Sequence, residues 1–235
     1  MAQRINEFGQ PIGHDVDGWV SCPRPPQVPL LGTYAHVVPL NAAAHLEDLN
    51  AAFATDTTGQ MWTYMPNGPF ADKDSLATFL KTAEASTDPL FYTIVDALSG
   101  RALGFASYLR IEPNAGVIEV GFIAMSPLLQ KTRIATEAMY LMMAHIFDDL
   151  GYRRYEWKCD NLNGPSKKAA RRFGFTYDGM FPQATIYKGR NRDTAWFSVL
   201  DKDWEGIKAG YEAWLDSANF DAERMQKTPL VTRKD

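Results

Sequence analysis

Cysteine and histidine are scarce in this chain of 235 residues. It contains two cysteines, Cys22 and Cys159, and four histidines. Their positions match neither a zinc-binding spacing nor the even set of cysteines of a disulfide framework. The sequence therefore predicts no metal site, and each histidine is interpreted as an ordinary core or surface residue. A reducing compartment, the cytoplasm, is the expected location.

A long apolar run is also missing. No segment approaches the ~18 consecutive apolar residues that a helix needs to span a bilayer. The first twenty residues lack the apolar core of a secretory signal. Hydrophobic residues make up 46% of the chain and charged residues 22%, which is typical of soluble globular proteins. Because no apolar run is long enough, no membrane is expected as a partner. The sequence also contains no internal repeat, Walker loop or Ser-His-Asp signature.

Charge is distributed unevenly along the chain, whose net charge is −4. Residues 1–129 carry 6 basic and 13 acidic side chains, and residues 193–235 carry 6 and 9. Residues 130–192 carry 12 basic and 6 acidic side chains. This basic middle segment suits an anionic ligand. Nucleic acid would also be attracted to it, but the acidic flanking segments would repel nucleic acid, so none is expected as a partner.

The hydrophobic pattern divides the chain into three parts. They are a Pro-rich extension (1–32), a regular domain (33–201), and an amphipathic helix with a tail (202–235). Within the domain, apolar alternation indicates strands and 3.6-residue periodicity indicates helices. The expected strands are 33–40, 90–97, 102–112, 116–125, 152–160, 175–184 and 193–201, and the expected helices are 42–53, 74–84, 134–150 and 165–174.

The most informative stretch runs from Val117 to Phe175. A strand of the buried type leads into a short basic loop, Gln130–Arg133, and a long helix begins at once. The first N–H groups of a helix have no partners inside the helix, and the helix dipole favours negative charge there. Farther on, Asn163-Gly164-Pro165-Ser166 opens a second, basic helix. This order of strand, loop and helix predicts an anion-binding site.

These motifs resemble those of the GNAT N-acetyltransferases. The pyrophosphate loop of that family reads roughly Q/R-x-x-G-x-G/A, and its next motif reads N-x-x-S/A followed by G-F. Gln130 and Ala135 occupy the outer positions of the loop, while Arg133 replaces its middle glycine. The second motif begins at Asn163 and closes with Gly174-Phe175. The branch that the chain resembles most is that of the ribosomal-protein N-terminal (alanine/serine) acetyltransferases.

The resemblance implies the GNAT acyl-CoA N-acyltransferase fold, an α/β (α+β) fold with a mostly antiparallel mixed sheet flanked by helices. It also implies acetyl-CoA as cosubstrate, no metal, and direct attack of a primary amine on the thioester in a ternary complex. The acceptor would be a small-molecule amine or a protein N-terminus. The rival hypothesis is a non-catalytic acyl-CoA-binding module, because the loop glycine is missing and Ala170 replaces a tyrosine frequent in relatives.

The coenzyme residues implied by the resemblance lie at the end of one strand, in the basic loop and in the second motif. They are Ala124, Met125, Gln130, Lys131, Thr132, Arg133, Ile134, Ala135 and Asn163. Because Arg133 does not adopt positive φ cheaply, the loop is expected to run in an ordinary conformation. Its guanidinium would then reach a phosphate. The alternative is that Lys131 and Arg133 are solvated loop charges.

Two residues are candidates for the acid–base chemistry. Glu119 lies in the middle of an apolar strand, where desolvation raises the pKa of a carboxyl group and suits it to act as a base. It would act directly or through water; the alternative is a structural glutamate. Ser166 matches the proton donor to sulfur in the branch named above. Its alternative role is to cap a helix.

The acceptor side is expected at an aromatic loop, residues 59–70. The resemblance places Trp62 and Tyr64 in the amine pocket with Phe70 nearby, and the alternative is a packed structural loop. Beyond the domain, residues 203–217 carry an aromatic stripe at helical spacing. Such a stripe either docks on the chain's own fold or meets another subunit, and a homodimer fits the branch.

Overall fold

The computed structural model describes residues 4–223 and 225–233. Eight strands form one sheet in the order β3-β4-β5-β6-β7-β8-β10-β9, and only the β7–β8 pair is parallel. The strands are β3 (Leu30–Leu31), β4 (Ala35–Pro39), β5 (Leu90–Asp96), β6 (Ala102–Glu112), β7 (Val117–Met125), β8 (Arg154–Asp160), β9 (Thr176–Tyr187) and β10 (Arg190–Leu200). The mostly antiparallel mixed sheet expected from the sequence is confirmed.

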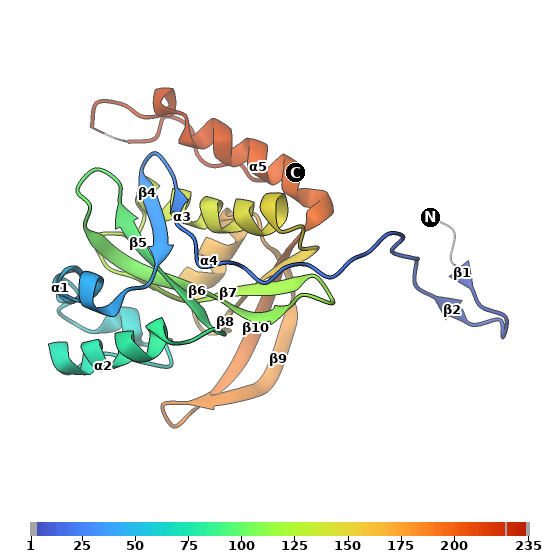
Figure 1. The fold of residues 1–235 in the computed structure, drawn as a ribbon, viewed down its shortest axis with the longest axis horizontal. Coiled ribbons are helices and arrows are strands. Elements are labelled where there is room, and N and C mark those ends of the chain that lie inside the picture. The colour runs from blue at the N-terminus through green and yellow to red at the C-terminus, as the bar shows by residue number, and fades with distance from the viewer. Residues whose placement is uncertain (1–3, 224, 234–235) are drawn as a thin grey trace.

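Five α-helices cover the two faces of the sheet (Figure 1). They are α1 (Ala42–Phe53), α2 (Lys73–Glu84), α3 (Arg133–Ala144), α4 (Gly164–Arg172) and α5 (Asp201–Leu215). Helices α1 and α2 enclose one hydrophobic core with the β4–β6 side of the sheet. Helix α3 encloses the other core, and α5 packs outside it. None of the helices in the described residues is long and apolar enough to cross a membrane.

The parallel pair β7–β8 is short. Its register joins Val117–Val120 to Arg154–Trp157, and no later residue of β7 pairs with β8. Helix α3 connects the two strands, as a parallel neighbour requires a crossover. Beyond Val120 the strands separate, and this gap becomes the site described below.

Helix α3 is shorter than the sequence predicts. The expected helix covered 134–150, but regular α-helix ends at Ala144 and a wide helical turn follows at His145–Asp149 (η2). The apolar periodicity continues through this turn, because Ile146 and Phe147 are buried. Periodicity therefore could not reveal the change of winding. Gly151 has a φ of 68°, a conformation that suits glycine at the end of the helical segment.

The Pro-rich extension contains more structure than expected. Its first part is a small hairpin, β1 (Arg4–Ile5) with β2 (Pro11–Ile12), which stands away from the body (Figure 1). The part from Trp19 onward runs along the domain. The hydroxyl groups of Tyr92 and Tyr152 donate to the carbonyl oxygens of Pro26 and Pro23, respectively.

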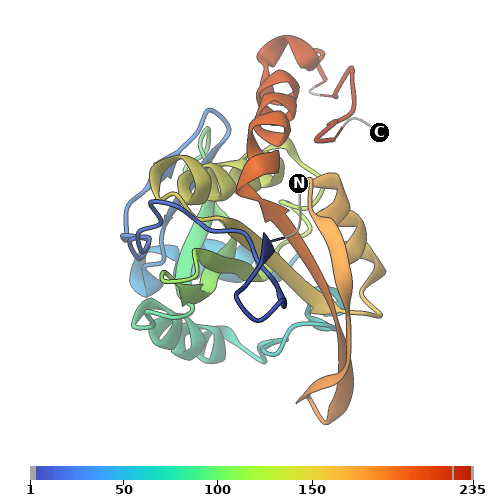
Figure 2. The ribbon, with the colours of Figure 1, turned by 90° about the vertical axis from the view of Figure 1, so that its right-hand side faces the viewer.

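The last two strands are longer than predicted and form a hairpin that projects from the body (Figure 2). The expected strands left residues 185–192 between them. In the structure, residues 185–187 belong to β9 and residues 190–192 to β10, so the loop is only Lys188-Gly189. Both of these residues have positive φ, which is the geometry of a two-residue turn that matches strand twist. Strand β9 is the edge of the sheet and is exposed over most of its length.

The aromatic stripe of α5 is buried within its own chain. Trp204, Ile207, Tyr211 and Trp214 are at most 6% exposed. Tyr140 of α3 stacks with Trp204 and Tyr211, at ring-centroid separations of 6.2 and 5.3 Å. The sequence left open whether the stripe docks on the chain's own fold or meets another subunit. In the structure it docks on the chain's own fold. It therefore gives no support for a dimer.

We predict that Trp204→Ala destabilises the protein by about 3–5 kcal/mol, because truncation leaves a cavity between α5 and α3. The measurement is urea unfolding followed by circular dichroism. Lys208→Ala is the control on the same helix, since it removes only a surface ion pair with Asp148 and changes stability by less than ~1 kcal/mol. Equal midpoints for the two variants would contradict this account of α5.

Candidate active site

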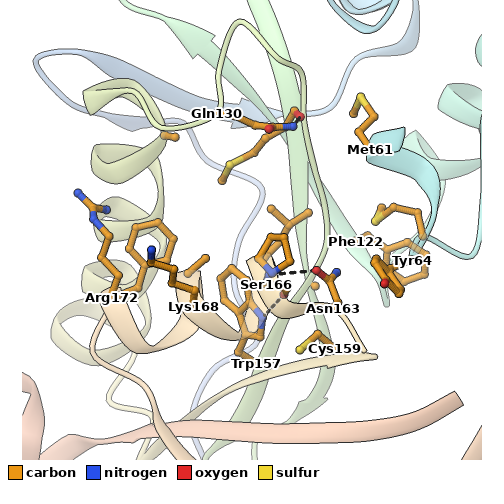
Figure 3. A pocket seen from close by; sticks show the side chains of 18 of the residues that line it. Met61, Tyr64, Phe122, Gln130, Trp157, Cys159, Asn163, Ser166, Lys168 and Arg172 are labelled. Carbon is orange, nitrogen blue, oxygen red and sulfur yellow. Dashed lines mark hydrogen bonds between the residues drawn. The ribbon is translucent and has the colours of Figure 1, made fainter. Parts of the chain in front are cut away.

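A cavity of about 2150 Å³ opens where β7 and β8 separate. Its walls come from the loop before α3, the start of α4, the 59–70 loop and the β9–β10 hairpin. Figure 3 shows Gln130 at one end, Met61 and Tyr64 on one side, and Lys168 and Arg172 on the opposite side. Segments far apart in sequence thus meet around one space.

The start of α3 faces this cavity. Thr132 caps the helix: its side-chain oxygen accepts from the Ala135 N–H at 3.1 Å. The side chain of Gln130 donates to the Met125 carbonyl at 2.9 Å and so fixes the loop to the end of β7. Residues 130–135 and Met125 all line the cavity, whereas Ala124 does not and lies in the core shared with α1 and α2.

The loop conformation differs from the expected one. Lys131 has a φ of 62°, so the chain does enter the left-handed region, two residues before Arg133. Arg133 itself is the first residue of α3. Its guanidinium lies 4.1 Å from the ring centroid of Tyr34 and 5.4 Å from that of Phe220. These aromatic faces hold the charge at the rim of the cavity, so Arg133 is not a freely solvated side chain.

Strand β7 carries a bulge in the cavity wall. Ser107 and Phe105 of β6 pair with Gly121 and Ala124, so Phe122 and Ile123 stand opposite one residue. Phe122 has a φ of 48°. A bulge leaves backbone groups without ladder partners. Both bulged residues line the cavity, so this is a place where backbone N–H groups are available to a ligand.

Glu119 lies in the same wall and is buried within a chain of alternating charges. Its Oε2 is 2.8 Å from Lys158 Nζ and 3.1 Å from Arg110 Nε. Lys158 also contacts Glu156 at 2.8 Å and lies 3.7 Å from the ring centroid of Trp196. Arg154 continues the chain from Glu156 at 2.6 Å. The sequence analysis did not identify these partners, because they come from strands far apart in sequence.

Burial raises the pKa of Glu119 above its ordinary value, although Lys158 and Arg110 act in the opposite direction. Glu156, in contrast, has a lowered pKa: burial opposes the shift, and hydrogen bonds from Lys158 and Arg154 outweigh it. Two carboxyl groups on neighbouring strands thus differ in basicity. The more basic one lines the cavity.

The second motif is arranged differently from the expectation. Asn163 is the N-cap of α4, because its Oδ1 accepts from the Ser166 N–H at 3.0 Å. Ser166 therefore does not cap the helix. Its Oγ accepts a hydrogen bond from Trp157 Nε1 at 3.0 Å (Figure 3). In that bond Ser166 is the acceptor, so its hydroxyl group can still act as a donor.

Two of the three expected acceptor residues lie behind the wall. Trp62 is 3% exposed and stacks edge-on with Phe53 and Phe70, so aromatic packing holds both Trp62 and Phe70 away from the cavity. Tyr64 does line the cavity, and its hydroxyl donates to the Leu162 carbonyl at 3.2 Å. The loop is thus both a packed structure and a wall: Trp62 and Phe70 pack behind it, and Tyr64 lines the cavity.

Strand β8 and the hairpin contribute residues that the sequence did not indicate. Cys159 lines the cavity and is buried, and burial raises the pKa of its thiol. Tyr187 donates to Asp160 at 2.8 Å, and burial together with this carboxylate raises the pKa of the phenol to about 12. Within residues 4–223 and 225–233, no group of three acidic, histidine or cysteine side chains is arranged to hold a metal ion.

Comparison with known proteins identifies the family of this chain. The model of the acetyltransferase (GNAT) domain matches residues 37–176. The chain belongs to the GNAT family of acetyltransferases. A crystal structure of a GCN5-related N-acetyltransferase from Brucella melitensis is 45% identical, has a TM-score of 0.89, and is matched over 92% of this chain and 97% of that one. The GNAT relationship inferred from the two motifs is confirmed.

Two further relatives are more distant. The N-acetyltransferase YnaD of Bacillus subtilis, whose own function is uncharacterised, is 24% identical over 67% of this chain and 91% of its own length. RimL, a ribosomal L7/L12 α-N-protein acetyltransferase solved in complex with coenzyme A, is 18% identical with a TM-score of 0.61, and the match covers 73% of this chain and 97% of RimL. At that identity RimL shows a shared fold only. Dependence on acetyl-CoA is general for the GNAT family.

Proposed function

We propose that this GNAT protein transfers the acetyl group of acetyl-CoA to a primary amine by direct attack within a ternary complex. The observation that carries the proposal is the single cavity at the β7–β8 separation. It joins a capped helix start at one side to a buried carboxylate of raised pKa at the other. One space can therefore hold both an anionic coenzyme and a nucleophile.

The coenzyme binds at the α3 side. Its pyrophosphate accepts hydrogen bonds from the N–H groups of the first helical turn, where the dipole also favours negative charge. Arg133 stands at the same helix start, held by Tyr34 and Phe220. The pantetheine arm then enters the separation between the strands and passes Asn163 at the start of α4. The capping bond uses only the Asn163 oxygen, so its amide N–H groups remain available.

Glu119 serves as the base, directly or through a water molecule. An attacking amine must be neutral, because an ammonium group has no lone pair with which to form the new C–N bond. An α-amine has a pKa of ~8 and a lysine amine ~10.4, so a proton has to be removed near neutral pH. Glu119 accepts that proton in its ionised form, and burial makes it a stronger base than an exposed glutamate.

Backbone and Ser166 complete the reaction. As the amine attacks, the thioester carbonyl becomes an oxyanion, which the free N–H groups of the β7 bulge stabilise. When the C–S bond breaks, the electron pair leaves with sulfur. Ser166 donates its proton toward that thiolate, since Trp157 already occupies the serine oxygen as an acceptor. The missing tyrosine at Ala170 is therefore not needed as the donor.

The decisive experiment measures thiol release from acetyl-CoA with a panel of primary amines, including short peptides with free N-termini. A catalyst releases coenzyme A thiol in an amine-dependent way, and mass spectrometry detects the N-acetyl product. Acetyl-CoA binding without amine-dependent release would instead indicate the non-catalytic module.

We predict that Arg133→Ala weakens acetyl-CoA binding by roughly 1–3 kcal/mol, because it removes a charge-assisted hydrogen bond to phosphate. Isothermal calorimetry at moderate salt measures the change. Arg101→Ala is the control, since Arg101 is an exposed arginine near Asp48 and outside the cavity. Unchanged affinity in Arg133→Ala would show that Arg133 contributes only to packing against Tyr34.

We predict that Glu119→Gln lowers turnover by ~10²–10⁴-fold, because the amide keeps the shape but accepts no proton. Acetyl-CoA affinity should stay within about twofold of the parent. Steady-state kinetics at pH 7.5 measure the turnover, and calorimetry measures the acetyl-CoA affinity. Near-normal turnover in this variant would exclude Glu119 as the base and leave it a structural partner of Lys158.

The pH profile provides a separate prediction. Because the base must be ionised, kcat falls as the pH drops through the raised pKa of Glu119 in the ternary complex. Lys158 favours the ionised form. Lys158→Met should therefore move the acidic limb of the kcat profile to higher pH. Circular dichroism checks that the variant is folded, and a limb at unchanged pH would show that Glu119 does not set it.

A further inference from the structure

Strand β10 presents a row of three side chains to the cavity. They are Arg192, Thr194 and Trp196. Trp196 covers Lys158, the partner of Glu119, so this row begins beside the proposed base. Arg192 lies toward the hairpin end of the row, where the register of β10 with β9 shifts between Arg192 and Thr194 because β9 carries the extra residues. Its position therefore depends on a sheet element and not on a loose loop.

Arg192 is incompletely satisfied. Its Nε is buried and has no hydrogen-bond partner among the described residues. Its guanidinium lies 5.8 Å from the ring centroid of Tyr187, but no ion pair links it to a carboxylate in the part of the chain that the structure describes. A buried donor left unpaired is costly. This arginine thus has unused capacity for a ligand.

The carboxylates of this wall already have hydrogen-bond or ion-pair partners. Asp160 accepts from Tyr187 and from the Leu162 N–H, each at 2.8 Å. Glu119 and Lys158 neutralise one another. Arg192 thus faces the cavity without an ion-pair partner among the described residues. A guanidinium in this situation favours a planar or tetrahedral oxyanion, which it binds through two parallel N–H groups.

The location of Arg192 points to the acceptor and not to the coenzyme phosphates. Strand β10 pairs Thr194 with Asp160 and Ala195 with Cys159 of β8, so Arg192 lies just beyond the end of β8. Arg192 therefore belongs to the hairpin side of the cavity, next to the β8 end from which α4 starts. The phosphates belong at the α3 start, where the loop 130–135 and Arg133 lie.

We propose that the amine acceptor carries an anionic group, a carboxylate or a phosphate, that binds Arg192 while its amine approaches Glu119. This proposal rests on the proposed function and names its substrate class. Thr194 and Tyr187 flank the anion, and Trp196 lies beneath the carbon chain that joins the anion to the amine. Arg192 is then the residue that determines which amines are accepted.

The test uses ω-amino acids with one to five methylene groups, each paired with its own uncharged carboxamide, and ω-aminoalkylphosphonates as the phosphate-like arm. For the parent protein, kcat/KM should favour one anionic series over the amides. Arg192→Gln should lower kcat/KM for that series by on the order of 10–100-fold and for the amides by less than about threefold. Arg192→Lys keeps the charge and should recover part of the loss.

The variant-to-parent ratio cancels the intrinsic reactivity of each amine. Arg101→Gln controls for loss of a surface arginine, and calorimetry should show unchanged acetyl-CoA affinity in Arg192→Gln. An equal loss for acids and amides, or a parent that prefers the amides, would overturn the proposal while the acetyltransferase function stands. Absence of thiol release with every amine would overturn the proposed function itself.

Discussion

The early end of the β7–β8 pairing is the constraint on which the rest of the structure depends. Two parallel strands need a crossover, here α3, and the crossover must start where β7 ends. Because pairing stops after Val120 and Trp157, the strand ends diverge instead of continuing the ladder. The start of α3 and the start of α4 are thereby placed on opposite rims of one opening. A longer ladder would close the space between them.

Strand alternation then decides what the opening contains. Ile118 and Val120 of β7 are buried in the core against α3, so Glu119 must point to the opposite face. On β8, Trp157 enters the same core, and Lys158 shares the cavity face with Glu119. Charges brought this close to the interior are tolerated only when they are paired. The chain of alternating charges from Arg110 to Arg154 follows from that requirement. Within it, Lys158 and Arg110 oppose the rise in the pKa of Glu119 that burial causes.

The sequence was sufficient for those features that depend on local pattern. Alternation and periodicity identify every long strand and helix among the described residues, and the loop before α3 marks the proposed coenzyme end. Features that depend on tertiary pairing were not predictable. Ser166 resembles a cap in sequence, yet Asn163 three residues earlier takes that role and Trp157, from another strand, binds the hydroxyl. Likewise Trp62 lies in an aromatic loop, but only packing against Phe53 shows that it faces inward.

The two halves of the cavity differ in the polar groups that lack a partner. This difference indicates which ligand each half suits. At the α3 side the free groups are the N–H groups of a helix start together with Lys131 and Arg133, a set that any phosphate ester would satisfy. At the hairpin side the carboxylates have hydrogen-bond or ion-pair partners, whereas the Arg192 guanidinium retains a buried free donor among the described residues. A neutral amine would leave that donor unpaired in the complex. An acceptor with its own anion removes the penalty, which is the physical reason for the acceptor class proposed above.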